Sequence, residues 1–136
     1  MDYLEQLPQI PTLVVEDVNV VRVQIRELLR SVGFRNIYEA KTGAEAAQLI
    51  NENDIQVILC DCHLDGLDGL SLLQYMKEQQ RLSGAVFIMV SADNTKKTIL
   101  LSIQAGVDDY IVKPLKADQI RSKVLGHMRK KGVFSK

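Results

Sequence analysis

Short apolar runs alternate with segments of helical periodicity along almost the whole chain. Most of the runs are apolar at successive rather than alternate positions, which is typical of strands buried on both faces of a sheet. Parallel strands of this kind need helical crossovers, and right-handed crossovers place helices on both sides of the sheet. We therefore predict an α/β fold, a doubly wound five-stranded parallel sheet with five helices. The expected strands are residues 11–15, 36–40, 55–60, 85–90 and 109–112.

Apolar residues recur at helical spacing between these runs, and small or capping residues mark the helix ends. Gly33 and Gly106 follow two of the segments, where a helix commonly ends at glycine, and Thr42 is a suitable N-cap for a third. The residues that this periodicity places on the helices are Val21, Ile25, Leu28, Leu29, Val32, Ala46, Leu49, Ile50, Leu70, Leu73, Met76, Ile99, Ile103, Ile120, Val124 and Met128.

The length of 136 residues suits one ordinary domain with one core. Lys and Arg together number 17, as do Asp and Glu, so the chain has no general attraction to nucleic acid or to anionic lipid. The first residues lack the positive charge and apolar stretch of a signal peptide, and no apolar run approaches the ~20 residues that span a bilayer. We therefore expect a soluble, cytoplasmic protein in which Cys60 and Cys62 are reduced thiols.

Polar residues cluster where the predicted strands end. Glu16 and Asp17 follow the first strand, Asp61 ends the third, Ser91 follows the fourth and Lys113 follows the fifth. The carboxyl ends of parallel strands meet at one edge of a doubly wound sheet, so these side chains are expected to converge. Converging carboxylates repel one another unless a cation neutralises them, and an all-oxygen cluster suits Mg²⁺. A lysine and a hydroxyl opposite the acids can hold the oxygens of a phosphoryl group.

These residues form a pattern that resembles the receiver domain of bacterial response regulators. The pattern has a Glu-Asp pair at 16–17, an Asp that opens D-x-x-L-x-x-x-D-G at 61–69, a Ser-Ala pair at 91–92 and a Lys-Pro pair at 113–114. The resemblance covers residues 11–130, with a short N-terminal extension at 1–10 and a C-terminal tail at 131–136. It implies the flavodoxin-like strand order 2-1-3-4-5.

The resemblance implies a role for each residue of the pattern. Asp61 is the expected phosphoacceptor, taking a phosphoryl group from a phosphohistidine of a sensor histidine kinase or a histidine phosphotransfer protein. Mg²⁺ is the expected cofactor, held by Asp17, Asp61 and the backbone carbonyl of His63, with Glu16 holding it directly or through water. Lys113 is expected to contact a phosphoryl oxygen.

The resemblance also implies a switch. Ser91 is expected to hydrogen-bond another phosphoryl oxygen, and Tyr110 matches the aromatic residue that changes rotamer when the hydroxyl moves. The surface expected to change is built from residues 95–128 and binds a downstream protein. Few residues follow the last predicted helix, so we expect a stand-alone regulator that catalyses only its own phosphorylation and dephosphorylation. The Lys113–Pro114 peptide bond is a candidate for the cis form.

One position departs from the family pattern. Family members usually carry proline four residues after the acceptor, whereas this chain has Asp65 followed by Gly66. The change replaces a stiff backbone with a flexible turn and adds a carboxylate near the metal. Loop rigidity and metal affinity are therefore the properties that this departure affects.

Other functions fit parts of the pattern. A Mg²⁺-dependent nucleic-acid enzyme of the topoisomerase-primase type would need a basic surface and Asp-x-Asp where the chain has Asp61-Cys62-His63. A flavin carrier with the same sheet would need a loop rich in Ser, Thr and Gly where residues 16–21 read EDVNVV. A receiver-like module that binds partners without phosphorylation is a further alternative, which the intact acids, Ser91 and Lys113 disfavour.

Cys60, Cys62 and His63 also suggest a zinc site. Zinc usually takes four ligands, and the one other histidine, His127, lies on the last predicted helix and far from the loop. We therefore interpret both cysteines as core residues that point away from Asp61, and His63 as an exposed loop residue.

Overall fold

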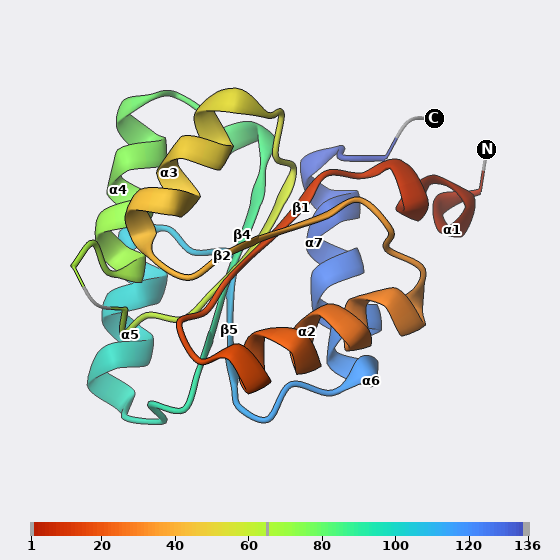
Figure 1. Cartoon of the computed structure of the whole chain (residues 1–136). Coiled ribbons are helices and arrows are strands. Elements are labelled where there is room, and N and C mark those ends of the chain that lie inside the picture. Colours follow the sequence, from red (N-terminus) through yellow and green to blue (C-terminus); the bar gives the residue numbers. More distant parts are fainter. Residues whose placement is uncertain (1, 65, 135–136) are drawn as a thin grey trace.

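Five parallel strands form one sheet in the order β2-β1-β3-β4-β5 (Figure 1). The computed structural model describes residues 2–64 and 66–134. The doubly wound sheet and the strand order expected from the sequence are confirmed, and each strand lies close to its predicted position. The strands are β1 (Thr12–Val15), β2 (Ile37–Ala40), β3 (Val57–Cys60), β4 (Val86–Ser91) and β5 (Asp109–Val112).

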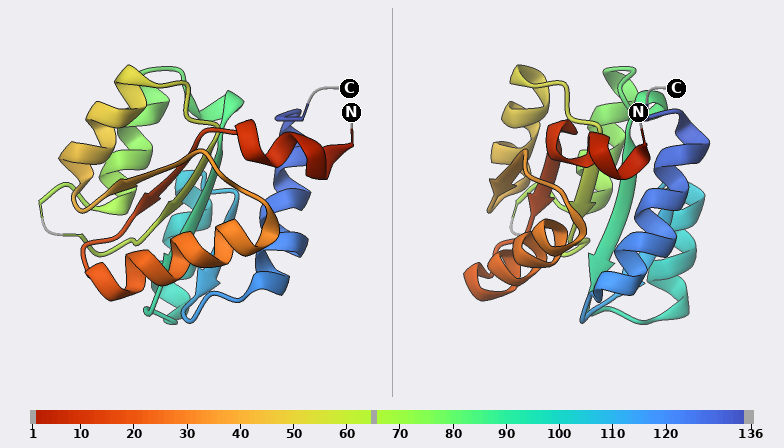
Figure 2. Two further views of the ribbon diagram at one scale, coloured as in Figure 1. Left: turned by 45° about the vertical axis from the view of Figure 1, so that its right-hand side comes forward. Right: turned by 90° about the vertical axis from the view of Figure 1, so that its right-hand side faces the viewer.

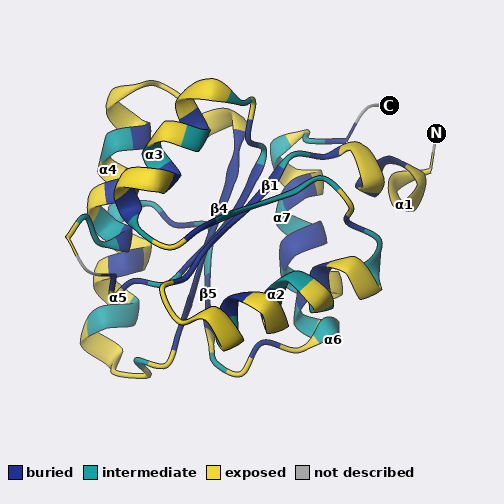
Figure 3. Ribbon diagram, in the orientation of Figure 1, coloured by how far each residue is buried: buried dark blue, intermediate teal, exposed yellow. Residues whose placement is uncertain are grey.

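Helices cover both faces of the sheet, and the strands β1, β3 and β4 are buried between them (Figure 3). One face carries α2 (Asn19–Val32) and a C-terminal helical segment made of α6 (Ala117–Gln119), the π-helical turn η3 (Ile120–Val124) and α7 (Leu125–Lys131). The other face carries α3 (Gly43–Glu52), α4 (Gly69–Glu78) and α5 (Lys96–Ala105), and the short turn η2 (Leu82–Gly84) leads into β4. Among the described residues, no helix has the length and apolar character that crossing a bilayer requires.

Local capping sets the helix ends, as the sequence predicted. The Thr42 side chain accepts a hydrogen bond of 3.1 Å from the Glu45 N–H at the start of α3. Gly33 ends α2 with a φ of 131°, a conformation that side chains rarely adopt, and its N–H bonds to the carbonyls of Leu29 and Arg30. The φ of Gly106 at the end of α5 is also positive. These glycines turn the chain back toward the next strand.

α5 does not bury the face that its periodicity suggested. Ile103 is 45% exposed, whereas Ser102 is fully buried and donates a hydrogen bond of 2.8 Å to the Thr98 carbonyl. The hydrogen bond within the helix satisfies the buried hydroxyl. Ile103 lies on a helix, as predicted, but the segment ILLSI is apolar on several sides, so periodicity alone does not select the face that packs on the sheet.

The N-terminal extension completes one of the two cores. It forms α1 (Tyr3–Gln6) and the 3₁₀ turn η1 (Leu7–Gln9), neither of which the sequence analysis predicted. Leu7 is fully buried in the core between the sheet, α2 and the C-terminal helical segment. Tyr3 stacks on Phe134 with ring centroids 4.7 Å apart, so the two ends of the chain lie side by side (Figure 2).

We expect Leu7→Ala to lower the free energy of unfolding by about 2–5 kcal/mol, because the change leaves a cavity in a closely packed core. The packing around Leu7 is close: a Cβ added at Gly33, at the end of α2, would lie 3.3 Å from Leu7 Cδ1. Leu4→Ala is the matched control, since Leu4 is 58% exposed, and it should change the stability by less than about 0.5 kcal/mol. Urea unfolding measures both variants, and equal effects would show that the extension adds nothing to the core.

Candidate functional site

Three carboxylates meet where β1 and β3 end. Glu16 and Asp17 follow β1, Asp61 follows β3, and one oxygen from each residue lies within 4.8 Å of the others. β1 and β3 are neighbours in the sheet, and Val15 pairs with Cys60, so the register places the residues that follow them side by side. The structure thus brings together the acids that the strand ends predicted, while their role as metal ligands stays a prediction.

Lys113 lies between the acids. Its Nζ donates a hydrogen bond of 2.8 Å to Asp61 Oδ2 and a second hydrogen bond to Glu16 Oε1. The residue follows β5, and the Lys113–Pro114 peptide bond is cis. One ammonium group balances only one of the three carboxylates, so the cluster retains an excess of negative charge.

Burial and pairing together set the ionisation of this cluster. Burial raises the pKa of Glu16, which is 1% exposed, although hydrogen bonds from Lys113 and the Val18 N–H oppose the shift. Burial acts in the same direction on Asp61, but hydrogen bonds from Lys113 and the His63 N–H outweigh it and hold its pKa below the usual value. Desolvation alone would lower the pKa of Lys113. Its hydrogen bonds and charge attraction to Asp61 and Glu16 outweigh desolvation, so the pKa of Lys113 is raised. Asp61 and Lys113 are therefore both charged at neutral pH.

The donor set of the cluster fits Mg²⁺. The three side chains offer carboxylate oxygens, which this hard cation prefers, and Asp17 is exposed, so water can complete the coordination. One divalent cation would also balance the charge that Lys113 leaves uncompensated. In the described part of the chain, no other three histidine, cysteine or acidic side chains come together in this way. Glu16, Asp17 and Asp61 are therefore the residues that could hold the ion.

A zinc site at the cysteines has no support in the structure. Cys60 and Cys62 are free, buried thiols. The His127 ring pairs with Asp109, with Nε2 and Oδ2 3.1 Å apart, and lies on α7. His63 pairs instead with Asp93, so the four candidate zinc ligands do not assemble.

Arg22 holds the loop after β1 in place, a role that the sequence analysis missed. The side chain is almost fully buried, and its Nη1 donates a hydrogen bond of 2.9 Å to the Glu16 carbonyl. Its Nε bonds to Glu39 on β2 at 3.2 Å, and its Nη2 bonds to Asn19 at 2.7 Å. A guanidinium with three acceptors fixes the backbone that carries the acidic pair. The one available signal was that Arg22 shares a helix face with the buried residue Ile25.

Ser91 and Tyr110 lie together beside the acids. Ser91 ends β4 and is 1% exposed, and its hydroxyl helps to lower the pKa of Asp61. Tyr110 comes from β5 and is buried, and its hydroxyl donates a hydrogen bond of 2.6 Å to the Asp93 carbonyl. The two residues predicted to form the switch therefore lie within one buried group next to the predicted acceptor.

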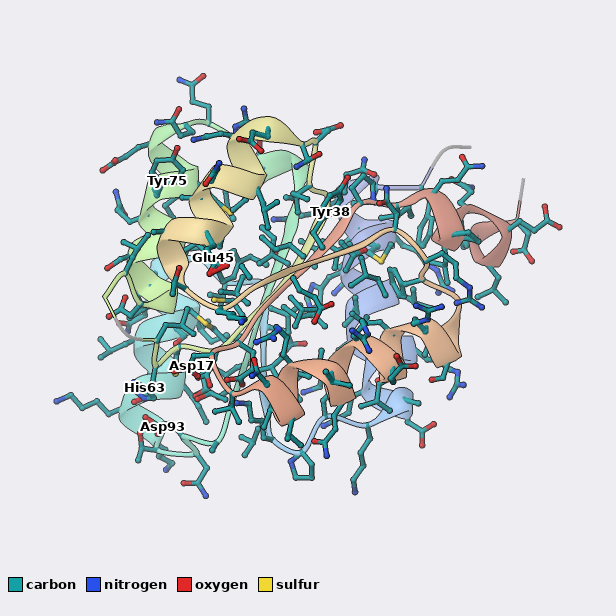
Figure 4. The ribbon with its side chains drawn as sticks, viewed as in Figure 1. Asp17, Tyr38, Glu45, His63, Tyr75 and Asp93 are labelled. Carbon is teal, nitrogen blue, oxygen red and sulfur yellow. The ribbon has the colours of Figure 1, made fainter. Side chains whose placement is uncertain are left out.

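His63 and Asp93 join the loops that follow β3 and β4. The His63 ring is exposed, as expected, but its Nε2 lies 2.8 Å from Asp93 Oδ2. Figure 4 shows both residues near Asp17, at the same end of the molecule. The sequence carried no signal for this pair, because the two residues belong to different loops.

Cys62 is buried, as predicted, but it contacts more than the core. Its Sγ lies 3.1 Å from Ser91 Oγ and 3.7 Å from Tyr110 Oη. Asp65, which stands where the family usually has proline, lies outside the described residues, so its proximity to the metal stays a prediction. The next residue, Gly66, has a φ of 77°, as expected for an Asp-Gly turn.

We expect Asp17→Asn to weaken Mg²⁺ binding by roughly tenfold or more, because the change removes one charged oxygen ligand from a cation that prefers such ligands. Asp54→Asn, a change at an exposed acid outside the cluster, is the control and should leave the affinity unchanged. Asp65→Asn should have a much smaller effect than Asp17→Asn. Titration with Mg²⁺, followed by NMR or thermal shift, measures all three, and equal losses at 17 and 65 would mean that the Asp-Gly loop supplies a ligand.

Solved structures of receiver domains share this fold. A response regulator receiver domain protein from Clostridium thermocellum superposes with a TM-score of 0.82 at 21% identity, covering 91% of this chain and 98% of that one. The signal receiver domain of an HD domain-containing protein from Pseudomonas fluorescens Pf-5 superposes with a TM-score of 0.80 at 22% identity, covering 93% of this chain and 100% of that one. At these identities the likeness shows the fold alone.

Sequence comparison is more specific. Chemotaxis protein CheY-3 of Vibrio cholerae is 31% identical over 112 residues, which cover 82% of this chain and 86% of that protein. Chemotaxis protein CheY of Pseudomonas aeruginosa is 32% identical over 112 residues, which cover 82% of this chain and 90% of that protein. A family model, the response regulator receiver domain, matches residues 12–125, which include every residue of the acidic cluster. The chain therefore belongs to the response regulator receiver domain family.

Proposed function

We propose that this protein is a single-domain response regulator that carries a phosphoryl group on Asp61 and changes its affinity for a partner protein in response. The observation that carries the proposal is the position of Lys113 Nζ, which bonds to Asp61 within a cluster of three carboxylates. A purely structural ion pair needs one acid for one lysine. The two further acids leave a negative charge that one Mg²⁺ would balance.

The chemistry required of the protein is modest. Phosphoryl transfer needs mainly a positioned nucleophile and neutralisation of the phosphoryl oxygens. An oxygen of the ionised Asp61 attacks the phosphorus of a phosphohistidine; the new P–O bond forms as the P–N bond breaks, and the imidazole nitrogen keeps the electron pair. Lys113 then holds one phosphoryl oxygen, and the Ser91 hydroxyl donates to another. Mg²⁺, when bound, neutralises charge on the phosphoryl oxygens.

Membership of the receiver family implies a phosphodonor partner, and we propose a sensor histidine kinase or a histidine phosphotransfer protein. The partner must bring its phosphohistidine to the edge of the sheet where Asp61 lies. Apolar surface borders that edge: Val18 and Val20 are 51% and 66% exposed just before and within α2. A groove between α2 and the loop after β5 continues this surface and includes Leu28 and Pro114. Docking here would place the donor beside Lys113.

The proposed output surface is the face formed by α5, β5 and the C-terminal helical segment, within residues 95–128. Leu100, Leu101 and Ile103 on α5 are 56%, 46% and 45% exposed, and Val112 on β5 is 37% exposed. Exposed aliphatic residues gathered on one short helix are typical of a protein-binding surface. We propose a downstream protein as the target rather than nucleic acid, because acidic and basic residues balance. The two free thiols are consistent with action in the cytoplasm.

Incubation with acetyl phosphate tests the proposed function. We expect one phosphoryl group to be added in the presence of Mg²⁺ and none when a chelator is present, because the acids otherwise repel an anion. Peptide mass spectrometry should locate the group on Asp61. Modification of Ser91 or His63 would contradict the assignment. If no residue is modified, the alternative of a receiver-like module that binds without phosphorylation would be favoured.

A further inference from the structure

The Cys62 thiol lies between the two residues of the proposed switch. Cys62 directly follows Asp61 and is 5% exposed. Its S–H donates to Ser91 Oγ at 3.1 Å, and Tyr110 Oη lies 3.7 Å from the same sulfur. Both distances are within the range for hydrogen bonds that involve sulfur. One side chain thus contacts both residues of the proposed switch.

The hydrogen bonds of Ser91 leave its own proton available. A serine hydroxyl has one proton to donate and two lone pairs that accept. The Cys62 S–H occupies one lone pair, and the Asp93 N–H, 3.3 Å away, occupies the other. The Ser91 proton is therefore not needed by either of these partners and is available to another acceptor, such as an oxygen of a phosphoryl group on Asp61.

Tyr110 competes with Ser91 for the thiol. The Tyr110 hydroxyl donates its own proton to the Asp93 carbonyl, so toward Cys62 it can only accept. The thiol has one proton, which can bond to Ser91 or to Tyr110 but not to both. If the Ser91 hydroxyl turns away toward a phosphoryl group, Tyr110 Oη is the acceptor that is left within reach of the sulfur.

The backbone of Cys62 is fixed while these hydroxyls rotate. Its carbonyl accepts a hydrogen bond of 3.2 Å from the Gly69 N–H at the start of α4. α4 packs so closely that a Cβ at Gly69 would lie 2.9 Å from the Cys62 Cα and 2.7 Å from the Asp61 carbonyl oxygen. The Cys62 backbone is therefore held in place, and both hydroxyls lie within reach of the thiol that it carries.

We propose that Cys62 is a positioning residue that couples Ser91 to Tyr110: its thiol proton bonds to Ser91 in the present conformation and to Tyr110 once the Ser91 hydroxyl has turned toward a phosphoryl group on Asp61. Tyr110 is already buried in the present conformation, and the exchange adds a hydrogen bond that holds it there in the phosphorylated protein. The inference rests on the proposed function, because it assumes that Asp61 carries the phosphoryl group.

Infrared spectroscopy tests the hydrogen bonds without any phosphoryl group. Cys60→Ala leaves Cys62 as the one remaining thiol, and its S–H stretching band lies apart from other protein bands. In this background we expect the lowest band frequency with Ser91 present, a higher one in Ser91→Ala, where Tyr110 becomes the acceptor, and the highest in Ser91→Ala/Tyr110→Phe. A band that stays at one frequency in all three proteins would overturn the proposal.

NMR of the Tyr110 ring tests the coupling itself, with Mg²⁺ and beryllofluoride as a stable mimic of the phosphoryl group. Cys62→Val removes the donor and nearly keeps the volume, and Cys62→Ala serves if valine is too large. Either variant should reduce the equilibrium constant for the Tyr110 response by roughly threefold, as expected for the loss of one weak hydrogen bond. Cys62→Ser keeps a donor and should retain the response. Cys60→Val is the control, because Cys60 is also buried but, among the hydrogen bonds of the described residues, its thiol bonds to the Asp61 carbonyl rather than to Ser91 or Tyr110.

The outcomes separate the inference from the proposed function. A parent-like Tyr110 response in Cys62→Val, or an equal loss in Cys62→Ser, would overturn the coupling role while the proposed function stands. Failure of the unaltered protein to bind beryllofluoride with Mg²⁺ would overturn the proposed function, and with it the coupling to a phosphoryl group. In that case the infrared bands would still decide whether the thiol proton moves between Ser91 and Tyr110.

Discussion

An Asp61→Asn protein is expected to take up no phosphoryl group from acetyl phosphate under conditions in which the unaltered protein is modified. The neutral amide lacks the charged oxygen that must attack phosphorus, and it cannot form an acyl phosphate. Intact-mass spectrometry measures the difference. Asp118→Asn is the matched control, because the Asp118 side chain is 96% exposed and far along the chain from the acidic cluster, and it should be modified like the parent.

The Asp61→Asn protein should remain folded, so that the loss reports on chemistry. Asparagine has nearly the same size as aspartate, and Lys113 keeps Glu16 as a charged partner. Thermal unfolding should therefore show a single transition close to that of the parent. A variant that is folded and still modified would place the acceptor elsewhere in the cluster, with Asp17 the first residue to examine.

Lys113→Met is expected to have the second largest effect, and the effect should depend on Mg²⁺. The change leaves the carboxylate of Glu16, which is 1% exposed, without its counter-ion, close to two further acids. Breaking a buried ion pair by removing one partner typically costs about 3–5 kcal/mol, so a loss of that order is expected in the free energy of unfolding when a chelator is present. Added Mg²⁺ should restore more stability to the variant than to the parent, because the cation takes over the neutralisation of the acids.

Urea unfolding with chelator and with Mg²⁺ measures this dependence. Lys116→Met is the control, since Lys116 is exposed and its side chain forms no ion pair with the described residues. The same variant should also be modified by acetyl phosphate far more slowly, because the cation that holds a phosphoryl oxygen is missing. A Lys113→Met protein as stable as the parent in chelator would show that the Glu16 carboxyl is protonated without its partner.

Several features of the fold were not predictable from local pattern. The N-terminal elements carry Leu7 into the core, but four residues of helix are too few to show a period. The buried face of α5 could not be selected from the sequence because apolar residues surround the helix, so the neighbours of α5 rather than its own sequence select that face. In both places the local sequence is compatible with more than one packing arrangement.

The sequence by itself determined the architecture and the composition of the acidic edge. Runs that are apolar on both faces require a covered parallel sheet, and parallel strands end at the same edge. Knowing which residue follows each strand was therefore enough to bring Glu16, Asp17, Asp61 and Lys113 together without any knowledge of side-chain positions. Only the tertiary structure decided that Cys62 contacts Ser91 and Tyr110. That contact joins side chains from β5, from the end of β4 and from the loop after β3. It depends on rotamers and on distances of a few tenths of an ångström, which period and propensity do not encode.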